Sequence, residues 1–326
     1  MKKIAIIGAG ATGLFLANFL KHGAKVTVFE KSYRVGGRAS SRSNPKISFD
    51  HGAQFISIKN KQFDRFLEKL GYQRVVARWD GKFVSIDSRS LTSQNLRDKI
   101  RYVGVPSMQS IFEFLSKGVD LRLCTYVDSM VRQNDDWILR SGSSQNTSRF
   151  DWVILAIPPT QVISLLPSEQ QTWLDILNNL TMLPCVSLMA SIKSLGDMPW
   201  SGARIKNSPL GWVAFNNTKP LRSSSLALVA QTDYYWTKKH IDKSDSDIEA
   251  ELIQEIKRLV PFHIEFVNYE LKKWNYAVVE KPLNENFLIA KKQGLAVAGD
   301  WCIGGNIESS FESARSLSDK FFREVI

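Results

Sequence analysis

The feature that most constrains the fold lies near the amino-terminal end, where the apolar run KKIAII leads directly into GAGATG. Residues 2–7 are typical of a strand buried in a parallel sheet. Residues 11–23 then carry apolar side chains at helical spacing and close with a glycine, and residues 24–30 predict a second strand. This order of strand, glycine-rich turn, helix and strand predicts a Rossmann-type βαβ unit, and therefore an α/β fold built on a parallel sheet.

The three glycines of the turn have separate physical tasks. Gly8 permits the tight turn, Gly10 lets a pyrophosphate approach the backbone, and Gly13 lets the helix pack closely on the strand. The amino terminus of the helix adds N–H groups and a positive dipole end. Glu30 can accept both ribose hydroxyls of an adenosine and would repel a 2′-phosphate. The motif alone leaves NAD and FAD open, and the residues predicted to bind the dinucleotide are Gly8, Ala9, Gly10, Ala11, Thr12, Gly13, Glu30 and Lys31.

Composition limits the partners that we expect. Lys and Arg number 43 against 32 Asp and Glu, a net charge of +11 that would attract anions such as nucleotides, nucleic acid or acidic membranes. The basic residues are scattered, so a solvated basic surface is favoured over specific nucleic-acid binding. Three cysteines without a CxxC pair suggest neither a disulfide framework nor a metal site and fit the cytoplasm. No segment of about 20 uninterrupted apolar residues predicts a membrane helix.

Two further stretches carry polar residues beside glycines. In VGGR, Gly37 allows another close approach of backbone to ligand, and Arg38 can place a guanidinium on a phosphate, although an ordinary turn with a surface arginine would look the same. In FDHGAQFI, Gln54 could hydrogen-bond a flavin edge or a substrate amide. We interpret His51 as a structural or pocket histidine rather than a general base.

These motifs together resemble the flavin amine oxidase superfamily, and most closely its renalase-like branch. The resemblance extends over nearly the whole chain and also includes RYVGVPSMQSIFEFL, GWVAFNNTKP, KKWNYA and GDWCIGGNIESSFESA. It implies non-covalent FAD, a Rossmann-type FAD-binding domain of the glutathione-reductase-like GG-R subfamily, and a mixed-sheet α+β substrate domain. Beyond the first motif it implies flavin contacts at Gly37, Arg38, Ala53, Gln54, Val127, Gly299, Asp300, Asn306 and Ile307, with Val127 on a strand that touches the adenine.

The stretch near the carboxyl-terminal end reads as a second strand–glycine–helix unit. A buried strand ends at Gly299 and Asp300, a turn follows, and residues 307–325 predict an amphipathic helix. On the resemblance, Asp300 would bond a ribityl or pyrophosphate-side group. N–H groups around Asn306 would face the pyrimidine end of the flavin, where a helix amino terminus stabilises negative charge. We interpret Cys302 as packing material rather than a reactive thiol.

The middle of the chain predicts a second domain. We expect Pro158-Pro159 to end a buried strand and mark the exit to it, and residues 262–279 to form paired strands. Its aromatic residues suggest a pocket that holds a flat substrate, and core packing is the alternative for each. The candidate pocket residues are Gln54, Trp212, Asn216, Trp274 and Tyr276. The predicted domains are 1–75 plus 104–162 plus 290–326 for the cofactor, and 76–103 plus 163–289 for the substrate.

The function that we expect is that of an FAD-dependent oxidase. The resemblance implies small planar donors, the 2- and 6-dihydro isomers of NAD(P), with hydride transfer to FAD and then reduction of O2, giving NAD(P)+ and H2O2. A free-amine oxidase is the first alternative, and a flavin- or nucleotide-binding module without turnover is the second. A membrane-docked desaturase is a lesser option. The catalytic side chain, if there is one, the natural acceptor and the oligomeric state stay open.

Overall fold

The chain folds into two compact units, each described here by itself. The computed structural model describes residues 1–43, 46–96, 99–142, 144–194, 196 and 199–326. The first unit consists of residues 1–38, 112–182 and 278–326. The second unit consists of residues 39–111 and 183–277.

These units differ in places from the predicted domain boundaries. Residues 39–75 and 104–111 were predicted to belong to the cofactor domain, but they pack with the second unit. Residues 163–182 and 278–289, predicted to belong to the substrate domain, pack with the first. Pro158 and Pro159 therefore lie inside the first unit, where they begin a helix instead of leading out of it. Which of these segments serve the cofactor and which the substrate stays a prediction.

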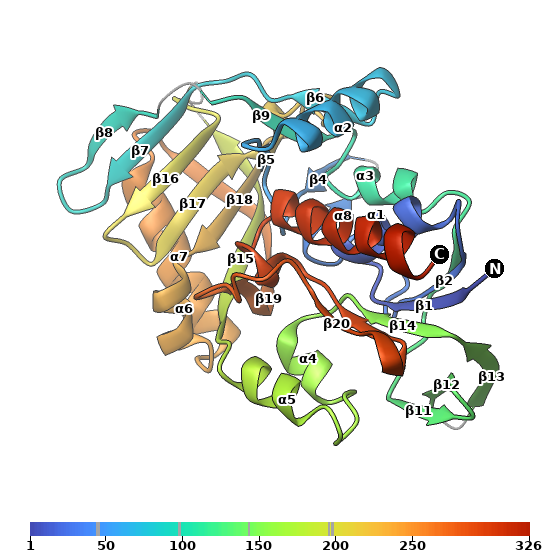
Figure 1. The fold of residues 1–326 in the computed structure, drawn as a ribbon. Helices are drawn as coiled ribbons and strands as arrows, with labels where there is room; N and C mark the ends of the chain where they lie inside the picture. The colour runs from blue at the N-terminus through green and yellow to red at the C-terminus, as the bar shows by residue number, and fades with distance from the viewer. Residues whose placement is uncertain (44–45, 97–98, 143, 195, 197–198) are drawn as a thin grey trace. The chain divides into compact units, whose positions relative to one another are not determined.

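The first unit is built on a six-stranded sheet in the order β10-β2-β1-β14-β21-β20 (Figure 1). Neighbouring strands are parallel, except that the edge strand β20 runs antiparallel to β21. The predicted βαβ unit is confirmed as β1, α1 and β2. The strands are β1 (Lys3–Ile7), β2 (Lys25–Phe29), β10 (Asp120–Arg122), β14 (Trp152–Leu155), β20 (Leu288–Ala290) and β21 (Leu295–Val297).

Helices cover the sheet of the first unit because its strands are apolar on both faces. Helices α1 (Ala11–Leu20) and α8 (Ile307–Glu324) lie side by side, and the rings of Phe15 and Phe311 meet edge to face with centroids 5.5 Å apart (Figure 1). A second core contains Trp137 and Trp301 and draws residues from a small antiparallel sheet. The remaining elements are α3 (Ser110–Leu115), β11 (Ser129–Gln133), β12 (Asp136–Ser141), β13 (Ser144–Phe150), α4 (Pro159–Ile163), α5 (Gln171–Asn178) and the 3₁₀ turns η3 (Lys291–Gln293) and η4 (Asp300–Cys302).

The second unit is built on a seven-stranded sheet in the order β19-β15-β18-β17-β16-β7-β8. It mixes antiparallel pairs with one parallel pair, β16 with β7, as a mixed-sheet domain should. The strands are β7 (Phe83–Asp87), β8 (Thr92–Asn95), β15 (Met182–Ser194), β16 (Gly202–Lys206), β17 (Leu210–Phe215), β18 (Ala227–Thr232) and β19 (Ile264–Val279).

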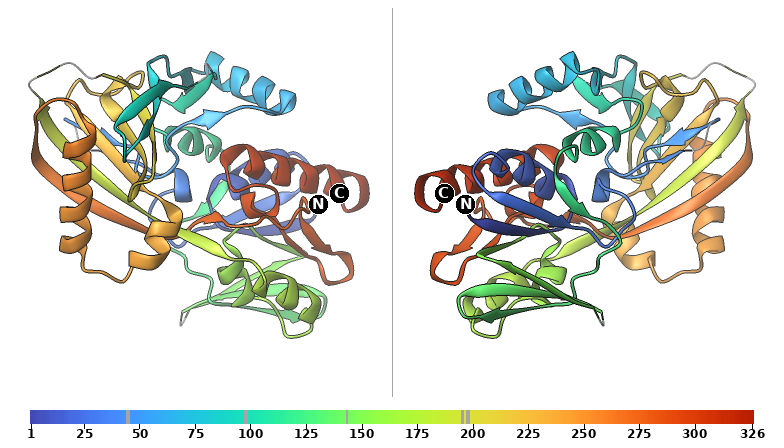
Figure 2. Two further views of the ribbon diagram at one scale, coloured as in Figure 1. Left: turned by 90° about the vertical axis from the view of Figure 1, so that its left-hand side faces the viewer. Right: turned by 90° about the vertical axis from the view of Figure 1, so that its right-hand side faces the viewer.

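Helix α7 (Asp245–Leu259) covers one face of this sheet (Figure 2). The Ser244 hydroxyl caps it, and Ile248, Leu252 and Ile256 are buried on its inner side. Residues 264–279 form the single strand β19 instead of the paired strands expected, because the segment contains no glycine or proline to turn the chain. The other elements are η1 (Gly37–Ala39), β3 (Arg42–Ser43), β4 (Ser48–Phe49), β5 (Ile56–Ser57), α2 (Lys61–Tyr72), β6 (Val76–Arg78), β9 (Arg101–Gly104), η2 (Asn216–Thr218) and α6 (Tyr234–His240).

Candidate functional site

The glycine-rich turn after β1 leaves open space in front of helix α1. Gly8 has a φ of 106°, and a Cβ there would meet the Ala156 carbonyl oxygen at 2.7 Å. A Cβ at Gly13 would overlap the carbonyl oxygen of Gly8, so the helix can pack this closely only with glycine. A Cβ at Gly10 would meet nothing within 4 Å. The space beside Gly10, at the amino end of α1, suits a pyrophosphate that approaches the backbone.

A second glycine turn lies against the first. Gly36 and Gly37 have φ values of 104° and 53°, and Gly36 forms a parallel bridge with Gly10. The Gly36 N–H donates to the Ala9 carbonyl at 2.9 Å. Two stretches that sequence analysis treated separately are thus joined at the carboxyl ends of the parallel strands, the edge where open α/β sheets bind ligands.

Glu30 braces the same region through its carboxylate. One oxygen accepts the Ala9 N–H at 2.8 Å, and the other accepts the Ser32 N–H at 2.8 Å. The side chain is buried, whereas Lys31 beside it is exposed. Each carboxylate oxygen can accept a further hydrogen bond. Glu30 can therefore hold the turn in place and still accept a ribose hydroxyl. Ala11 and Thr12 form the first turn of α1.

Arg38 and Asp300 are brought together although they are far apart in the sequence. The two guanidinium nitrogens of Arg38 donate to the two carboxylate oxygens of Asp300 at 2.9 and 2.5 Å. The Asp300 side chain is 6% exposed and that of Arg38 is 32% exposed. The cofactor contacts predicted for each residue stay predictions. Their pairing joins the chain after the second glycine turn to the start of the carboxyl-terminal strand–glycine–helix stretch, and it places a fixed guanidinium at this edge of the sheet.

The carboxyl-terminal stretch has the geometry of a capped helix. The Asn306 side chain accepts the Ser309 N–H at 2.9 Å and so begins α8, with Ile307 as its first residue. The Gly299 N–H donates to the Ser313 hydroxyl at 3.1 Å. Burial raises the pKa of the Cys302 thiol to about 12, so the thiol stays protonated and is no nucleophile. Val127 is buried in the first unit but lies in the loop between β10 and β11, and not on a strand as expected.

In the second unit, the stretch FDHGAQF contributes the carboxylate of a buried ion cluster. Asp50 Oδ2 lies 3.0 Å from Lys219 Nζ and 2.7 Å from the Nη2 of Arg222, and none of the three side chains is more than 1% exposed. Asp50 Oδ1 accepts the Ser41 hydroxyl at 2.6 Å and the Met108 N–H at 2.9 Å. One carboxylate thus faces two cations, and the cluster holds one excess positive charge.

Burial and charge oppose each other in this cluster. Burial alone would raise the pKa of Asp50, but the charges of Lys219 and Arg222, with hydrogen bonds from Arg222 and Met108, hold it well below its usual range. Burial lowers the pKa of Lys219 to about 8, although the Asp50 carboxylate acts in the opposite direction. Asp50 therefore remains a carboxylate at neutral pH.

Gln54 is turned inward and belongs to the same network. Its amide oxygen accepts from Lys219 Nζ at 3.3 Å, and its Nε2 donates to the carbonyls of Asp50 and, at 3.3 Å, of Gly52. The Gln54 amide is thus engaged within its own loop, and its predicted contact with the flavin stays a prediction. Ala53 belongs to that loop.

His51 and Trp274 form a stacked pair. Their ring centroids are 5.4 Å apart with an interplanar angle of 23°, and Lys272 Nζ lies 5.3 Å from the Trp274 ring. Burial, with the charges of Arg42 and Lys272, lowers the pKa of His51 to about 4, so the imidazole is neutral at neutral pH. Tyr276 is two residues further along β19 and 36% exposed. Trp274 and Tyr276 thus share a face of the strand, but the ring stacked on Trp274 is that of His51.

The other two pocket candidates lie on β17 and in the turn after it. Trp212 contacts the Phe55 ring with centroids 5.3 Å apart, and its Nε1 is buried without a hydrogen-bond partner among the described residues. Asn216 is fully buried, and its Nδ2 donates to the Ser48 carbonyl at 2.7 Å. Its Oδ1, like the Nε1 of Trp212, is buried without a hydrogen-bond partner among the described residues.

Asp50, Lys219 and Arg222 were not predicted from the sequence. Their signal was weak but present: an aspartate directly after a phenylalanine in SFDHG, and two basic residues close together in TKPLR. A charged residue in an apolar context needs a partner of opposite sign when it is buried. The partners are more than 160 positions apart, so the sequence could indicate the need for pairing but not the pairs.

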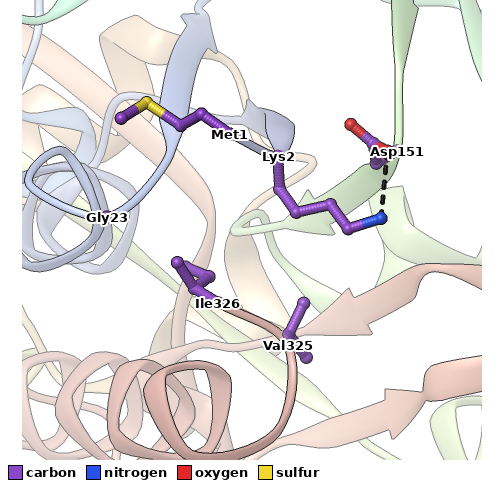
Figure 3. A pocket seen from close by; sticks show the side chains of 6 residues that line it. All are labelled: Met1, Lys2, Gly23, Asp151, Val325 and Ile326. Carbon is purple, nitrogen blue, oxygen red and sulfur yellow. Dashed lines mark hydrogen bonds and ion pairs between the residues drawn. The ribbon is translucent and has the colours of Figure 1, made fainter.

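A surface hollow lies at the opposite edge of the first sheet. Figure 3 shows it between the two chain ends, where Lys2 Nζ bonds Asp151 at 3.2 Å. Lys2 precedes β1 and Gly8 follows it, so the hollow is at the amino ends of the strands, away from the glycine turns. Within the residues that the structure describes, no group of three or more metal-binding side chains occurs. Over the same residues, no helix is long and apolar enough to span a membrane.

Comparison with known proteins identifies the family of this chain. A model described as an NAD(P)-binding Rossmann-like domain matches residues 6–70, and a model of flavin containing amine oxidoreductases matches residues 83–320. Renalase of Mus musculus is 23% identical over 97% of this chain and 98% of its own length. Two solved structures share the fold: cyclohexylamine oxidase from Brevibacterium oxydans, with a TM-score of 0.76 and 11% identity, and a triple mutant of putrescine oxidase, with 0.75 and 14%. Each covers 99% of both chains.

The fold is therefore a Rossmann-like FAD-binding amine oxidase fold with mixed α/β structure, and FAD is the cofactor. The open space beside Gly10, the brace at Glu30 and the glycine turns fit a dinucleotide of this kind. The protein is an FAD-dependent oxidoreductase, which removes the alternative of a module without turnover. The chain belongs to the flavin containing amine oxidoreductase family and, within it, is renalase-like.

Proposed function

We propose that the chain is an oxidase of small planar dihydronicotinamides, the 2- and 6-dihydro isomers of NAD(P), which it converts to NAD(P)+. The observation that carries the proposal is the similarity to renalase over 97% of the chain, with no large part of either protein left over. Bound FAD supplies a two-electron acceptor for the donor's hydride; dioxygen then takes both electrons with two protons and leaves as hydrogen peroxide. The same proposal includes the cytoplasm as the compartment and the glutathione-reductase-like grouping of the fold.

The residues of the first unit would bind and orient the cofactor. The N–H groups at the start of α1, beside Gly10, would hold the pyrophosphate, and Glu30 would accept a ribose hydroxyl. The Arg38–Asp300 pair would lie near the pyrophosphate and ribityl groups, and the amino terminus of α8 would favour negative charge. The positions of these residues at the carboxyl ends of the parallel strands support the proposed roles.

The residues of the second unit would orient the donor. A dihydronicotinamide loses a hydride without an acid or a base, and His51 is neutral because its pKa is lowered to about 4. The buried Nε1 of Trp212 could donate to a substrate oxygen. Positive charge from Lys272 beside Trp274 favours a donor that carries phosphates.

An amine oxidase is the second candidate, and the shared fold of cyclohexylamine oxidase and putrescine oxidase favours it. Two observations weigh against it. The ring that stacks on Trp274 is His51 rather than a second aromatic wall from Tyr276. The Lys272 ammonium already lies over the Trp274 face, the place where an aromatic wall would attract an amine cation.

The test is the visible spectrum of the purified holoenzyme, kept free of oxygen, while donors are added one at a time. The proposal expects rapid bleaching of the flavin band by mixed 2- and 6-dihydro isomers of NAD, followed by recovery and peroxide release in air. The ordinary 4-dihydro isomer is the matched control and should bleach the band much more slowly. A band that stays unchanged with the isomers, but bleaches with putrescine or cyclohexylamine, would replace the proposal by the amine oxidase.

A further inference from the structure

The loop of residues 50–54, which follows β4, is held from one side through its carbonyl oxygens. The His51 carbonyl accepts the Ser187 hydroxyl at 2.7 Å and the Nε1 of Trp274 at 3.0 Å. The next carbonyl along the chain accepts from the Nε2 of Gln231 at 2.7 Å. These donors are side chains of β15, β19 and β18, three neighbouring strands, so the sheet of the second unit fixes the direction of the loop.

The direction of these carbonyls determines the direction of the N–H groups. A trans peptide is planar, and its C=O and the following N–H point in opposite directions. The His51 and Gly52 carbonyls point to the donors on the sheet, so the N–H groups of Gly52 and Ala53 point away from them. Successive N–H groups on one side of a loop favour a carbonyl oxygen or an anion. The 50–54 loop therefore directs the N–H groups of Gly52 and Ala53 to the side opposite to the sheet.

Lys219 joins the two ends of this loop. Its ammonium group donates to the carboxylate of Asp50 at 3.0 Å and to the amide oxygen of Gln54 at 3.3 Å, and its side chain is fully buried. Gln54 in turn donates back to the carbonyls of Asp50 and Gly52. A single buried ammonium thus holds the first and last residues of the loop at a fixed separation.

Arg222 shares the carboxylate but not this connection. Its Nη2 bonds Asp50 at 2.7 Å and the Gly104 carbonyl at 2.9 Å, and its Nη1 bonds the Pro220 carbonyl. Among the described residues it makes no hydrogen bond to Gln54. Arg222 therefore connects the cluster to β9, whereas Lys219 connects the two ends of the 50–54 loop.

We propose that Lys219 is a positioning residue of the flavin reaction, which acts through Asp50 and Gln54 to aim the N–H groups of the 50–54 loop at a carbonyl-bearing or anionic edge of the ligand. This inference rests on the proposed function, since it deepens the role of the same site. The excess positive charge of the buried cluster favours the same kind of ligand. Lys219 itself touches neither cofactor nor substrate in this account.

The first experiment compares the holoenzymes of Lys219→Met and Lys273→Met. Methionine has a similar length but no charge. Lys273 is the matched control, because its ammonium bonds the Ile241 and Lys243 carbonyls and does not contact the 50–54 loop. We expect K219M to lower kcat at least tenfold with less change in KM, to shift the flavin absorbance maxima, and to speed amide hydrogen exchange in residues 48–56. K273M should match the wild type in all three measurements.

The second experiment tests whether Lys219 acts through Gln54. In a double-mutant cycle, K219M should cost much less in kcat when Gln54 is already leucine than it does in the wild type. K219R keeps the charge and should restore part of kcat and of the slow exchange. If the effects of K219M and Q54L on kcat simply multiply, the positioning role is overturned. It is overturned as well if K219M changes neither spectrum nor exchange.

The readouts separate this inference from the proposed function. If no dihydronicotinamide is oxidised, the proposed function fails, but the flavin spectrum and the exchange of residues 48–56 still report on Lys219. If K219M does not fold, the same contact can be tested by changing Gln54. The flavin spectrum and the hydrogen exchange of Q54L are then measured alone and in combination with K219R. A normal spectrum and slow exchange in folded Q54L would then contradict the proposal.

Discussion

The two units satisfy their buried polar groups in different ways. In the first, the carboxylates of Glu30 and Asp300 are bonded by backbone N–H groups and by one partly exposed arginine. In the second, Asp50 is fully buried between two cations. Among the described residues, buried side-chain atoms without a hydrogen-bond partner lie in the second unit and include Ser48 Oγ, His51 Nδ1, Ser85 Oγ, Trp212 Nε1 and Asn216 Oδ1. Backbone N–H groups satisfy the buried Glu30 carboxylate of the first unit, whereas the second unit keeps buried polar atoms that a ligand or water could bond.

The largest effect should come from the buried ions of the second unit. Asp50→Asn removes the only negative charge of the cluster and leaves Lys219 and Arg222 buried without it. Breaking a buried ion pair in this way costs about 3 to 5 kcal/mol. Urea denaturation of the apoprotein would measure the loss. The matched control is Glu265→Gln, which breaks an exposed pair with Lys193 and should cost less than about 1 kcal/mol. Equal losses would contradict the comparison.

Two glycines of the first unit should separate stability from cofactor binding. Gly13→Ala puts a methyl group into the Gly8 carbonyl and should destabilise the apoprotein by about 2 to 3 kcal/mol. Gly10→Ala meets nothing within 4 Å, so stability should change by less than about 0.5 kcal/mol. FAD affinity of Gly10→Ala should nevertheless fall at least about tenfold, near 1.4 kcal/mol, because the methyl group occupies the pyrophosphate's space. Unchanged affinity would show that FAD does not approach Gly10.

His51 should make the second unit sensitive to acid. Folding lowers the pKa of His51 from 6.5 to about 4. Between pH 6.5 and pH 4, the imidazole is therefore protonated in the unfolded chain but neutral in the folded protein. The free energy of unfolding therefore falls as the pH decreases through this range. The total loss is about 1.4 kcal/mol for each unit by which folding lowers the pKa. His51→Phe keeps a ring against Trp274 and should lose less stability between pH 7 and pH 5. Thermal denaturation at the two pH values measures the difference, and an equal loss in both proteins would contradict it.

The smallest effect on activity should come from Cys302. Its thiol is buried and protonated, so Cys302→Ala should leave turnover unchanged and cost about 1 kcal/mol of stability through the small cavity. Iodoacetamide should label the folded protein at Cys124, which is exposed, and at neither Cys185 nor Cys302. Inactivation that follows labelling of Cys302 would assign it a role that the structure does not support.

The parts of the fold that could be predicted from the sequence are those with local signals. The βαβ unit could be predicted because Gly8, Gly10 and Gly13 lie within six residues, and each is needed for a local feature of the backbone: the turn, the approach of a pyrophosphate and the close packing of the helix. Helix α7 has equally local signals, namely the cap at Ser244 and the helical spacing of Ile248, Leu252 and Ile256. Strand β19 was misjudged because alternating polar and apolar residues mark a strand but not its length.

The site could be predicted only where its residues act through the backbone. Arg38 and Asp300 were both selected, but their pairing depends on a contact across 262 positions. The Asp50–Lys219–Arg222 cluster was missed for the same reason, since burial decides whether a charge needs a partner and burial is a property of the fold. Gln54 was selected for a side-chain contact, yet its amide is used within its own loop.

The first unit is assembled from three separate stretches of chain, and this affects the order of events during synthesis. Helix α8 and strand β21 are translated after the whole of the second unit, yet they pack beside α1 and β14, which are translated before most of it. We therefore expect the first unit to stay incomplete on the ribosome until residues 278–326 have been made, and FAD to be loaded only after that point.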